Sequence, residues 1–145
     1  MGYTNYWGFK KIAKSKLPKI EKLYSQAISD CNGVIALYQS QAEDWERLSG
    51  YSAHAPYKYN GIKINGKDSE SCEDFILRAT YAESERDFCK TNQRSYDIAV
   101  KACLIILKKY LGTIFDWSCD SRNQLDHAQQ ALFLVNKFYN ERKAA

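Results

Sequence analysis

The segment Ser95–Leu111 carries the pattern that most limits what this chain can fold into. Apolar residues recur in it every three or four positions, which is the period of an α-helix. Ile98, Ile105 and Ile106 widen the apolar arc beyond a single stripe. A helix of this kind needs apolar cover on more than one side. We therefore expect it to be the central helix of the fold, ended by Gly112.

The same spacing predicts two more helices. One has Ser15 as its expected N-cap and an apolar face that runs from Ile20 to Cys31. Asn32-Gly33 is a natural stop for it, although the apolar spacing continues through Tyr38. The other spans Asn123–Arg142, and the tail from Arg142 onward is expected to fray.

Strand composition and turn pairs mark four further segments, which are Tyr3–Phe9, Tyr57–Ile64, Asp74–Tyr81 and Thr113–Cys119. Asn60-Gly61 and Asn65-Gly66 indicate at least one hairpin. The charged stretch from Glu83 to Arg94 is predicted as a loop. This order of elements favours an α+β fold, with about three helices packed on a mainly antiparallel sheet, in one domain over residues 1–145.

Charge and cysteine content exclude several classes of protein. The net charge of the 145 residues is only +4, and six lysines between Gly8 and Lys22 account for most of it. This balance argues against nucleic acid as a partner. The five cysteines show no C-x-x-C spacing and there are two histidines, so we expect no metal or other cofactor. Without a signal-like segment or a long apolar run, we expect a cytoplasmic protein without a membrane span.

The segment Tyr3–Trp7 is the first candidate for ligand contact. It places the rings of Tyr3, Tyr6 and Trp7 around the amide of Asn5. Aromatic rings stack on planar bases, and an amide can bond to the edge of a base. The same residues also suit a strand whose rings fill the core. The pattern leaves both interpretations open.

The loop that precedes the central helix is the second candidate. Lys90 and Arg94 come just before the expected helix start at Tyr96-Asp97, with the Thr91 hydroxyl between them. Free N–H groups, the positive end of the helix dipole and two cations together form an anion site. No G-x-x-x-x-G-K pattern is present, so this is not a triphosphate loop. The alternative is an ordinary capped helix with Ser95 as N-cap.

Catalytic patterns are weaker. A cysteine nucleophile paired with a histidine has little support, because no spacing selects a pair among Cys72, Cys89, His54 and His127. Carboxylate pairs such as Glu73 with Asp97 occur in most chains of this length. The lysine cluster near the N-terminus is typical of a solvated helix face.

Five fragments, taken in order, match one pattern: Met1-Gly2-Tyr3-Thr4-Asn5-Tyr6-Trp7, Tyr59-Asn60-Gly61, Cys72-Glu73-Asp74-Phe75-Ile76-Leu77, Phe88-Cys89-Lys90-Thr91 with Tyr96-Asp97, and Trp117-Ser118-Cys119-Asp120. They resemble a family of small bacteriophage and prophage proteins that open with Gly-Tyr-Thr-His-Tyr-Trp and carry a Phe-Cys-Lys-Thr segment. Asn5 stands where that motif has His, which favours binding over acid–base chemistry at this position. The resemblance implies a phage or prophage origin and a location in the host bacterial cytoplasm.

From these observations we expect non-catalytic binding of a small, anionic, nucleotide-like ligand. The expected ligand-binding residues are Tyr3, Asn5, Tyr6, Trp7, Asn60, Cys89, Lys90, Thr91, Arg94, Tyr96 and Asp97, which we expect to meet in one pocket. By analogy with other small phage binders, the ligand would be a host immune messenger. A cyclic dinucleotide or a cyclic ADP-ribose derivative is the expected class, and the protein would act as an anti-defence sponge.

Two other functions stay open at this point. One is a phage enzyme that cleaves a nucleotide or phosphodiester signal, with Asp97, Glu73 or Cys89 in acid–base or nucleophilic roles. The other is a protein-binding inhibitor of a host factor. The sequence also leaves open whether copies of the chain assemble into a homo-oligomer.

Overall fold

The aromatic N-terminal segment forms the central strand of a three-stranded antiparallel sheet. The computed structural model describes residues 3–49, 61–120 and 125–144, and in it β1 (Thr4–Phe9) pairs with β5 (Ser84–Lys90) and β6 (Phe115–Cys119). Because side chains alternate along a strand, Trp7 and Phe9 are buried in the core while Tyr6 lies on the opposite, outer face. The sheet therefore has one buried face and one face turned to solvent.

The stretch from Glu83 to Arg94 was predicted as a charged loop, and this prediction is wrong because most of it forms the strand β5. Seven residues of that stretch form a strand, in which Cys89 is buried and its neighbours Phe88 and Lys90 are exposed. A strand at the edge of a sheet, with one face in water, tolerates this many charges. The pairing shifts register between Trp7 and Phe9. Gly8 lies at this irregularity, where a Cβ atom would be 2.5 Å from the Glu85 carbonyl oxygen.

A second antiparallel sheet has the order β2 (Leu48–Ser49), β3 (Ile62–Gly66) and β4 (Phe75–Leu77). Its buried residues Ile62, Ile64 and Phe75 join the common core. The Phe75 ring meets the Trp7 ring edge-on, with centroids 5.1 Å apart, which links the two sheets. Of the two expected turn pairs, Asn60 lies outside the described residues, and Asn65-Gly66 belongs to β3 rather than to a turn. β4 is shorter than the strand expected at 74–81.

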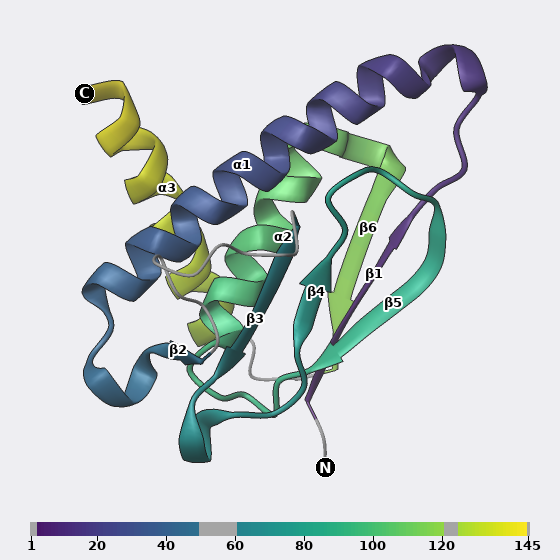
Figure 1. Cartoon of the computed structure of the whole chain (residues 1–145). Coiled ribbons are helices and arrows are strands. Elements are labelled where there is room, and N and C mark those ends of the chain that lie inside the picture. The colour runs from purple at the N-terminus through teal and green to yellow at the C-terminus, as the bar shows by residue number, and fades with distance from the viewer. Residues whose placement is uncertain (1–2, 50–60, 121–124, 145) are drawn as a thin grey trace.

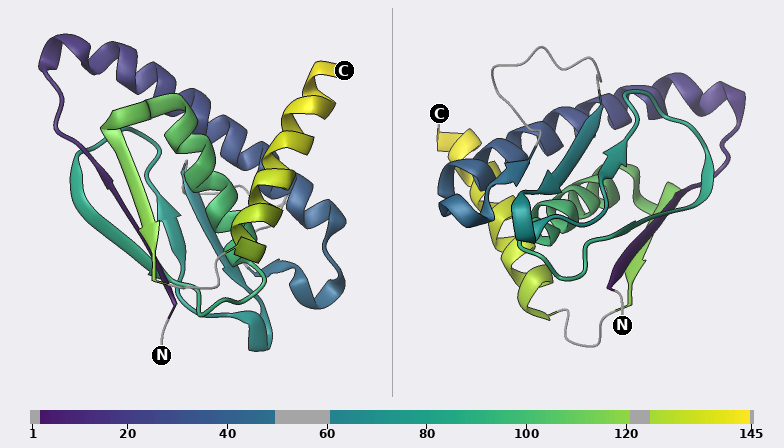
Figure 2. Two further views of the ribbon diagram at one scale, coloured as in Figure 1. Left: turned by 180° about the vertical axis from the view of Figure 1, so that it is seen from behind. Right: turned by 60° about the horizontal axis from the view of Figure 1, so that its bottom comes forward.

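Three helices cover the sheets in the described part of the chain (Figure 1). α2 (Asp97–Leu111) is the central one, as predicted, because ten of its 15 residues are buried. α1 (Leu17–Gln41) and α3 (Leu125–Ala144) pack on α2 (Figures 1 and 2). The α+β fold class expected from the pattern is confirmed. Short 3-10 turns lie at Lys14–Lys16, Asp44–Glu46, Asp68–Glu70 and Gly112–Ile114.

α1 does not end at Asn32-Gly33, where a stop was expected, but continues to Gln41. Gly33 serves packing instead: a Cβ atom there would lie 2.4 Å from a ring carbon of Phe138, so the glycine lets α3 approach α1 closely. Ser15 is also not the N-cap of α1. It lies in the preceding 3-10 turn, and Lys16 takes the cap position without a side-chain hydrogen bond.

The tail expected to fray is held by a buried carboxylate. Asp30 on α1 accepts hydrogen bonds from the hydroxyls of Tyr110 at 2.6 Å and Tyr139 at 2.7 Å. Arg142 Nη1 contacts the other Asp30 oxygen at 2.6 Å. These contacts connect all three helices and explain why α3 stays helical to Ala144. Among the described residues, no helix is long and apolar enough to span a bilayer.

Candidate functional site

Four side chains converge on the carboxylate of Asp97, the first residue of α2. Asn5 Nδ2 and Thr91 Oγ1 each donate to Asp97 Oδ1 at 2.7 Å. Lys101 Nζ and His127 Nδ1 lie 2.9 and 2.8 Å from Oδ2. These donors come from β1, the loop before α2, α2 itself and α3. We call these five residues the Asp97 cluster.

The hydrogen bonds keep Asp97 ionised despite its burial. Burial by itself raises the pKa of a carboxyl group, because the charged form loses its water. The hydrogen bond from His127 and the charge of Lys101 outweigh this effect and hold the pKa of Asp97 below its usual value. An ionised carboxylate can only accept hydrogen bonds, so the His127 nitrogen that faces it, Nδ1, must carry a proton.

Lys101 is the most unusual member of the Asp97 cluster, because its side chain is fully buried. It donates to Asn5 Oδ1 at 2.8 Å as well as to Asp97, and Nζ lies 4.3 Å from the centroid of the Tyr3 ring. Lys101 was not among the predicted site residues. One signal was available, because Lys101 follows Asp97 by four residues, and such pairs meet on one helix face.

The anion site predicted at the start of α2 is filled by the protein itself. The first N–H groups bond to local carbonyls: Asp97 N to Arg94 O at 3.0 Å and Ile98 N to Ser95 O at 3.2 Å. The Thr91 hydroxyl, expected to bind phosphate, bonds to Asp97 instead. Ser95 is not the N-cap, a position that Tyr96 takes without a side-chain bond. The negative charge at this helix terminus is thus the carboxylate of Asp97.

The other predicted site residues divide between the two faces of the β5–β1–β6 sheet. On the core side, Trp7 packs on Phe75, and Tyr96 donates its hydroxyl to Glu73 O at 2.7 Å. Cys89 is buried there, and burial raises the pKa of its thiol to about 12, so the thiol is a poor nucleophile at neutral pH. Asn60 lies outside the described residues. The structure therefore separates Trp7 from the outer-face residues Tyr6 and Lys90 rather than gathering all of them in one pocket.

Tyr6 and Lys90 belong to a row of side chains on the outer face of this sheet. Tyr6 pairs directly with Phe88, and Arg86, Phe88 and Lys90 occupy alternate positions of β5, which places them on one face. The guanidinium carbon of Arg86 lies 4.3 Å from the centroid of the Tyr6 ring. Phe88 is 63% exposed, which is unusual for a phenylalanine. The helices α2 and α3 lie on the other side of the sheet (Figure 2).

An open groove of about 850 Å³ runs along this outer face. It is bounded by residues 6–11, 83–86 and 116–118. Its cations are Lys10, Lys11 and Arg86, and its carboxylates are Glu83, Glu85 and Asp116. Lys10 Nζ lies 3.6 Å from Asp116 Oδ2, so this cation and this carboxylate already form an ion pair within the groove. Aromatic, cationic and anionic groups thus occur side by side.

Comparison of this chain with protein families, with curated proteins and with solved structures finds no match. The resemblance to the phage family therefore stays a prediction.

Proposed function

We propose that this protein binds a small, anionic, nucleotide-like ligand in the groove on the outer face of the β5–β1–β6 sheet. The observation that carries the proposal is the Arg86 guanidinium stacked on the Tyr6 ring, next to the exposed ring of Phe88. Exposed rings on an uncovered sheet face are a common platform for nucleobases. Arg86 adds a planar cation that can hold a phosphate by two hydrogen bonds.

The mixed charge of the groove favours a small nucleotide over a polymer. Lys11 and Arg86 suit one or two phosphates, and Lys90 adds a third cation on the same face of β5. Glu83 and Glu85 suit sugar hydroxyls, which carboxylates bind in many nucleotide sites. The same carboxylates would repel the continuous phosphate backbone of a nucleic acid. A cyclic dinucleotide or a cyclic ADP-ribose derivative matches this combination.

If the chain is of phage origin, as the resemblance implies, such binding would sequester a nucleotide messenger of host immunity in the bacterial cytoplasm. A sponge returns its ligand intact after the protein is denatured by heat, whereas an enzyme returns a product.

The proposal is tested by calorimetric titration with cyclic dinucleotides and ADP-ribose derivatives. Tyr6→Ala should weaken binding by about 1–3 kcal/mol, the usual value of one base–ring stack. Phe133→Ala is the matched control, because Phe133 is an even more exposed phenylalanine, at 73%, on α3. If no ligand of this panel binds the unaltered chain, or if Tyr6→Ala binds as tightly as the control, the groove is not the site.

A further inference from the structure

Six lysines lie at the end of the groove where the chain leaves β1. They are Lys10, Lys11, Lys14, Lys16, Lys19 and Lys22, and we call them the lysine cluster. All six are exposed, and Glu21 is the single acidic residue between Lys10 and Lys22. Lys10 pairs with Asp116, whereas the other five form no ion pair with a described residue. The lysine cluster therefore keeps nearly all of its positive charge.

This charge does not stabilise the helix on which half of it lies. Lys16 occupies the N-cap of α1 without a side-chain hydrogen bond, and the first turn contains no acidic residue. The N-terminus of a helix is the positive end of its dipole, so cations there are unfavourable. Lys16, Lys19 and Lys22 follow one another at intervals of three residues, at which like charges on a helix repel. An interaction with anions from solvent accounts for the lysine cluster, whereas the stability of α1 does not.

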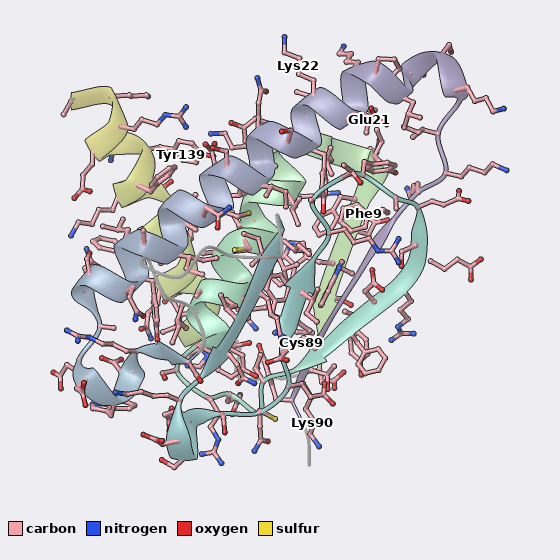
Figure 3. The ribbon with its side chains drawn as sticks, in the orientation of Figure 1. Phe9, Glu21, Lys22, Cys89, Lys90 and Tyr139 are labelled. Atoms are coloured by element: carbon pink, nitrogen blue, oxygen red, sulfur yellow. The ribbon has the colours of Figure 1, made fainter. Side chains whose placement is uncertain are left out.

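The lysine cluster begins inside the groove and continues away from it. Lys10 and Lys11 line the groove, and the chain then passes through the 3-10 turn at Lys14–Lys16 into α1, which begins beyond the end of β1 (Figure 1). Lys22 points from α1 into solvent (Figure 3). The usual rise per residue places the Cα atoms of Lys11 and Lys22 within about 25 Å of each other. The Debye length is about 30 Å at about 10 mM salt, so the whole cluster then acts on an anion in the groove.

From this arrangement we infer that the lysine cluster steers the anionic ligand into the groove from the end at Lys11. The inference rests on the proposed function and adds the direction from which the ligand arrives. Positive charge beside a cleft raises the local concentration of anions, and it raises association rates by roughly 10- to 1,000-fold in proteins that use this effect. The phosphates of the ligand reach Lys11 first, and the base then stacks on Tyr6 and Phe88.

The side chains that line the groove agree with this direction. Because Lys10 is paired with Asp116, Lys11 is the groove cation beside the cluster that is left for a phosphate. Tyr6 precedes Lys10 by four residues, which corresponds to about 13 Å of extended chain. A nucleotide can contact both ends of this span at once, whereas inorganic phosphate can occupy only one.

Steering and direct contact change different rate constants. A charge at the rim of a binding site changes mainly the association rate constant kon, and a charge in contact with the ligand changes mainly the dissociation rate constant koff. Lys16, Lys19 and Lys22 should therefore affect kon, and Lys11 should affect koff.

The test is the stopped-flow kinetics of two dianionic probes, ADP-ribose and cyclic di-AMP, with the full chain in about 10 mM salt. In the triple variant Lys16→Gln, Lys19→Gln, Lys22→Gln, we expect kon to fall about fourfold while koff stays the same, from the Coulomb attraction of three charges at this range. The fall should disappear at about 1 M salt, where the Debye length is about 3 Å. The melting temperature should be unchanged or higher, because repulsion on α1 is removed.

The matched control removes three lysines elsewhere, in the variant Lys67→Gln, Lys137→Gln, Lys143→Gln. It has the same net charge as the triple variant. Lys67 directly follows β3 and the other two lie on α3, and neither place is near the start of α1 in Figure 1. The kon of this control should stay close to that of the unaltered chain, and Lys11→Gln should raise koff.

The inference is overturned if the triple variant and the control have the same kon in low salt, or if the loss of affinity in the triple variant lies in koff. Either result leaves nucleotide binding in the groove intact and removes only the steering. If neither probe binds the unaltered chain, the groove is not the site, and the proposed function and the steering are both wrong.

Discussion

Asn5 and Asp97 are hydrogen-bonded at 2.7 Å, although 92 residues separate them in the chain. This contact joins the aromatic opening of the sequence to the start of the central helix. The two segments singled out as separate candidates for ligand contact therefore meet each other. Asn5 also accepts from Lys101, so its amide bridges the two opposite charges of the buried pair.

Asn5→Ala should destabilise the fold by about 1–3 kcal/mol, because it leaves buried donor and acceptor groups unpaired. Denaturation by urea measures the loss. Asn136→Ala, at an exposed position of α3, is the control and should change the stability by less than about 0.5 kcal/mol. Equal stability of Asn5→Ala and the control would mean that the amide contributes nothing to the Asp97 cluster.

Lys101→Met should cost about 3–5 kcal/mol, because the carboxylate of Asp97 then stays buried without its cation. Removing both charges in the double variant Asp97→Asn, Lys101→Met should cost less than the two single changes together, since neither charge is left alone. Thermal and urea unfolding of the four proteins give the coupling energy. The exposed Lys22, which points away from α1 in Figure 3, supplies the control Lys22→Met. Strict additivity would show that the pair is not coupled.

Alkaline pH should unfold this protein earlier than its composition suggests. Burial raises the pKa of Cys89 from 9.0 to about 12, and that of Tyr38 from 10.0 to about 12. In the unfolded chain these groups lose their protons first, so the folded state binds more protons between about pH 9 and 12. Stability then falls as pH rises through this window, by up to about 1.4 kcal/mol per pH unit for each group. A series of urea titrations from pH 8 to 11 measures the slope, which should be shallower in Cys89→Ala.

Lys90→Ala should show whether the Lys90 side chain binds a ligand or stabilises the fold. The Lys90 side chain is exposed and forms no ion pair with a described residue, so the melting temperature should hardly change. If Lys90 contacts a ligand phosphate, binding should weaken by about 1.5–3 kcal/mol. Calorimetric titration and a melting curve on the same sample give both values. A large loss of stability with unchanged affinity would assign Lys90 to the scaffold.

The helices and the α+β class could be predicted because helical periodicity is local. The strand β5 could not be predicted, because a solvated edge strand with one buried residue has the composition of a loop. Gly33 looked like a stop, and only the contact with Phe138 shows why it lies within a helix. Each of these differences arises where tertiary packing overrides a local signal.

The candidate site was predictable only in part, for the same reason. Asn5, Thr91 and Asp97 were selected from their residue types, but no local pattern shows that they bond to one another. Lys101 could have been found from its spacing, because it follows Asp97 by four residues and such pairs meet on one helix face. His127 had none, because 30 residues and a second helix separate it from its partner.

The central position of β1 has a consequence for how the chain folds as it is made. β1 is synthesised before both of its partners, because β5 and β6 begin about 80 and 110 residues later in the chain. At roughly 5–20 residues per second on the ribosome, both edges of an aromatic strand stay unpaired for at least several seconds. A nascent chain in this state is exposed to aggregation, because open strand edges can pair with other chains. A chaperone that covers β1 until β5 and β6 have been made should therefore reduce this aggregation.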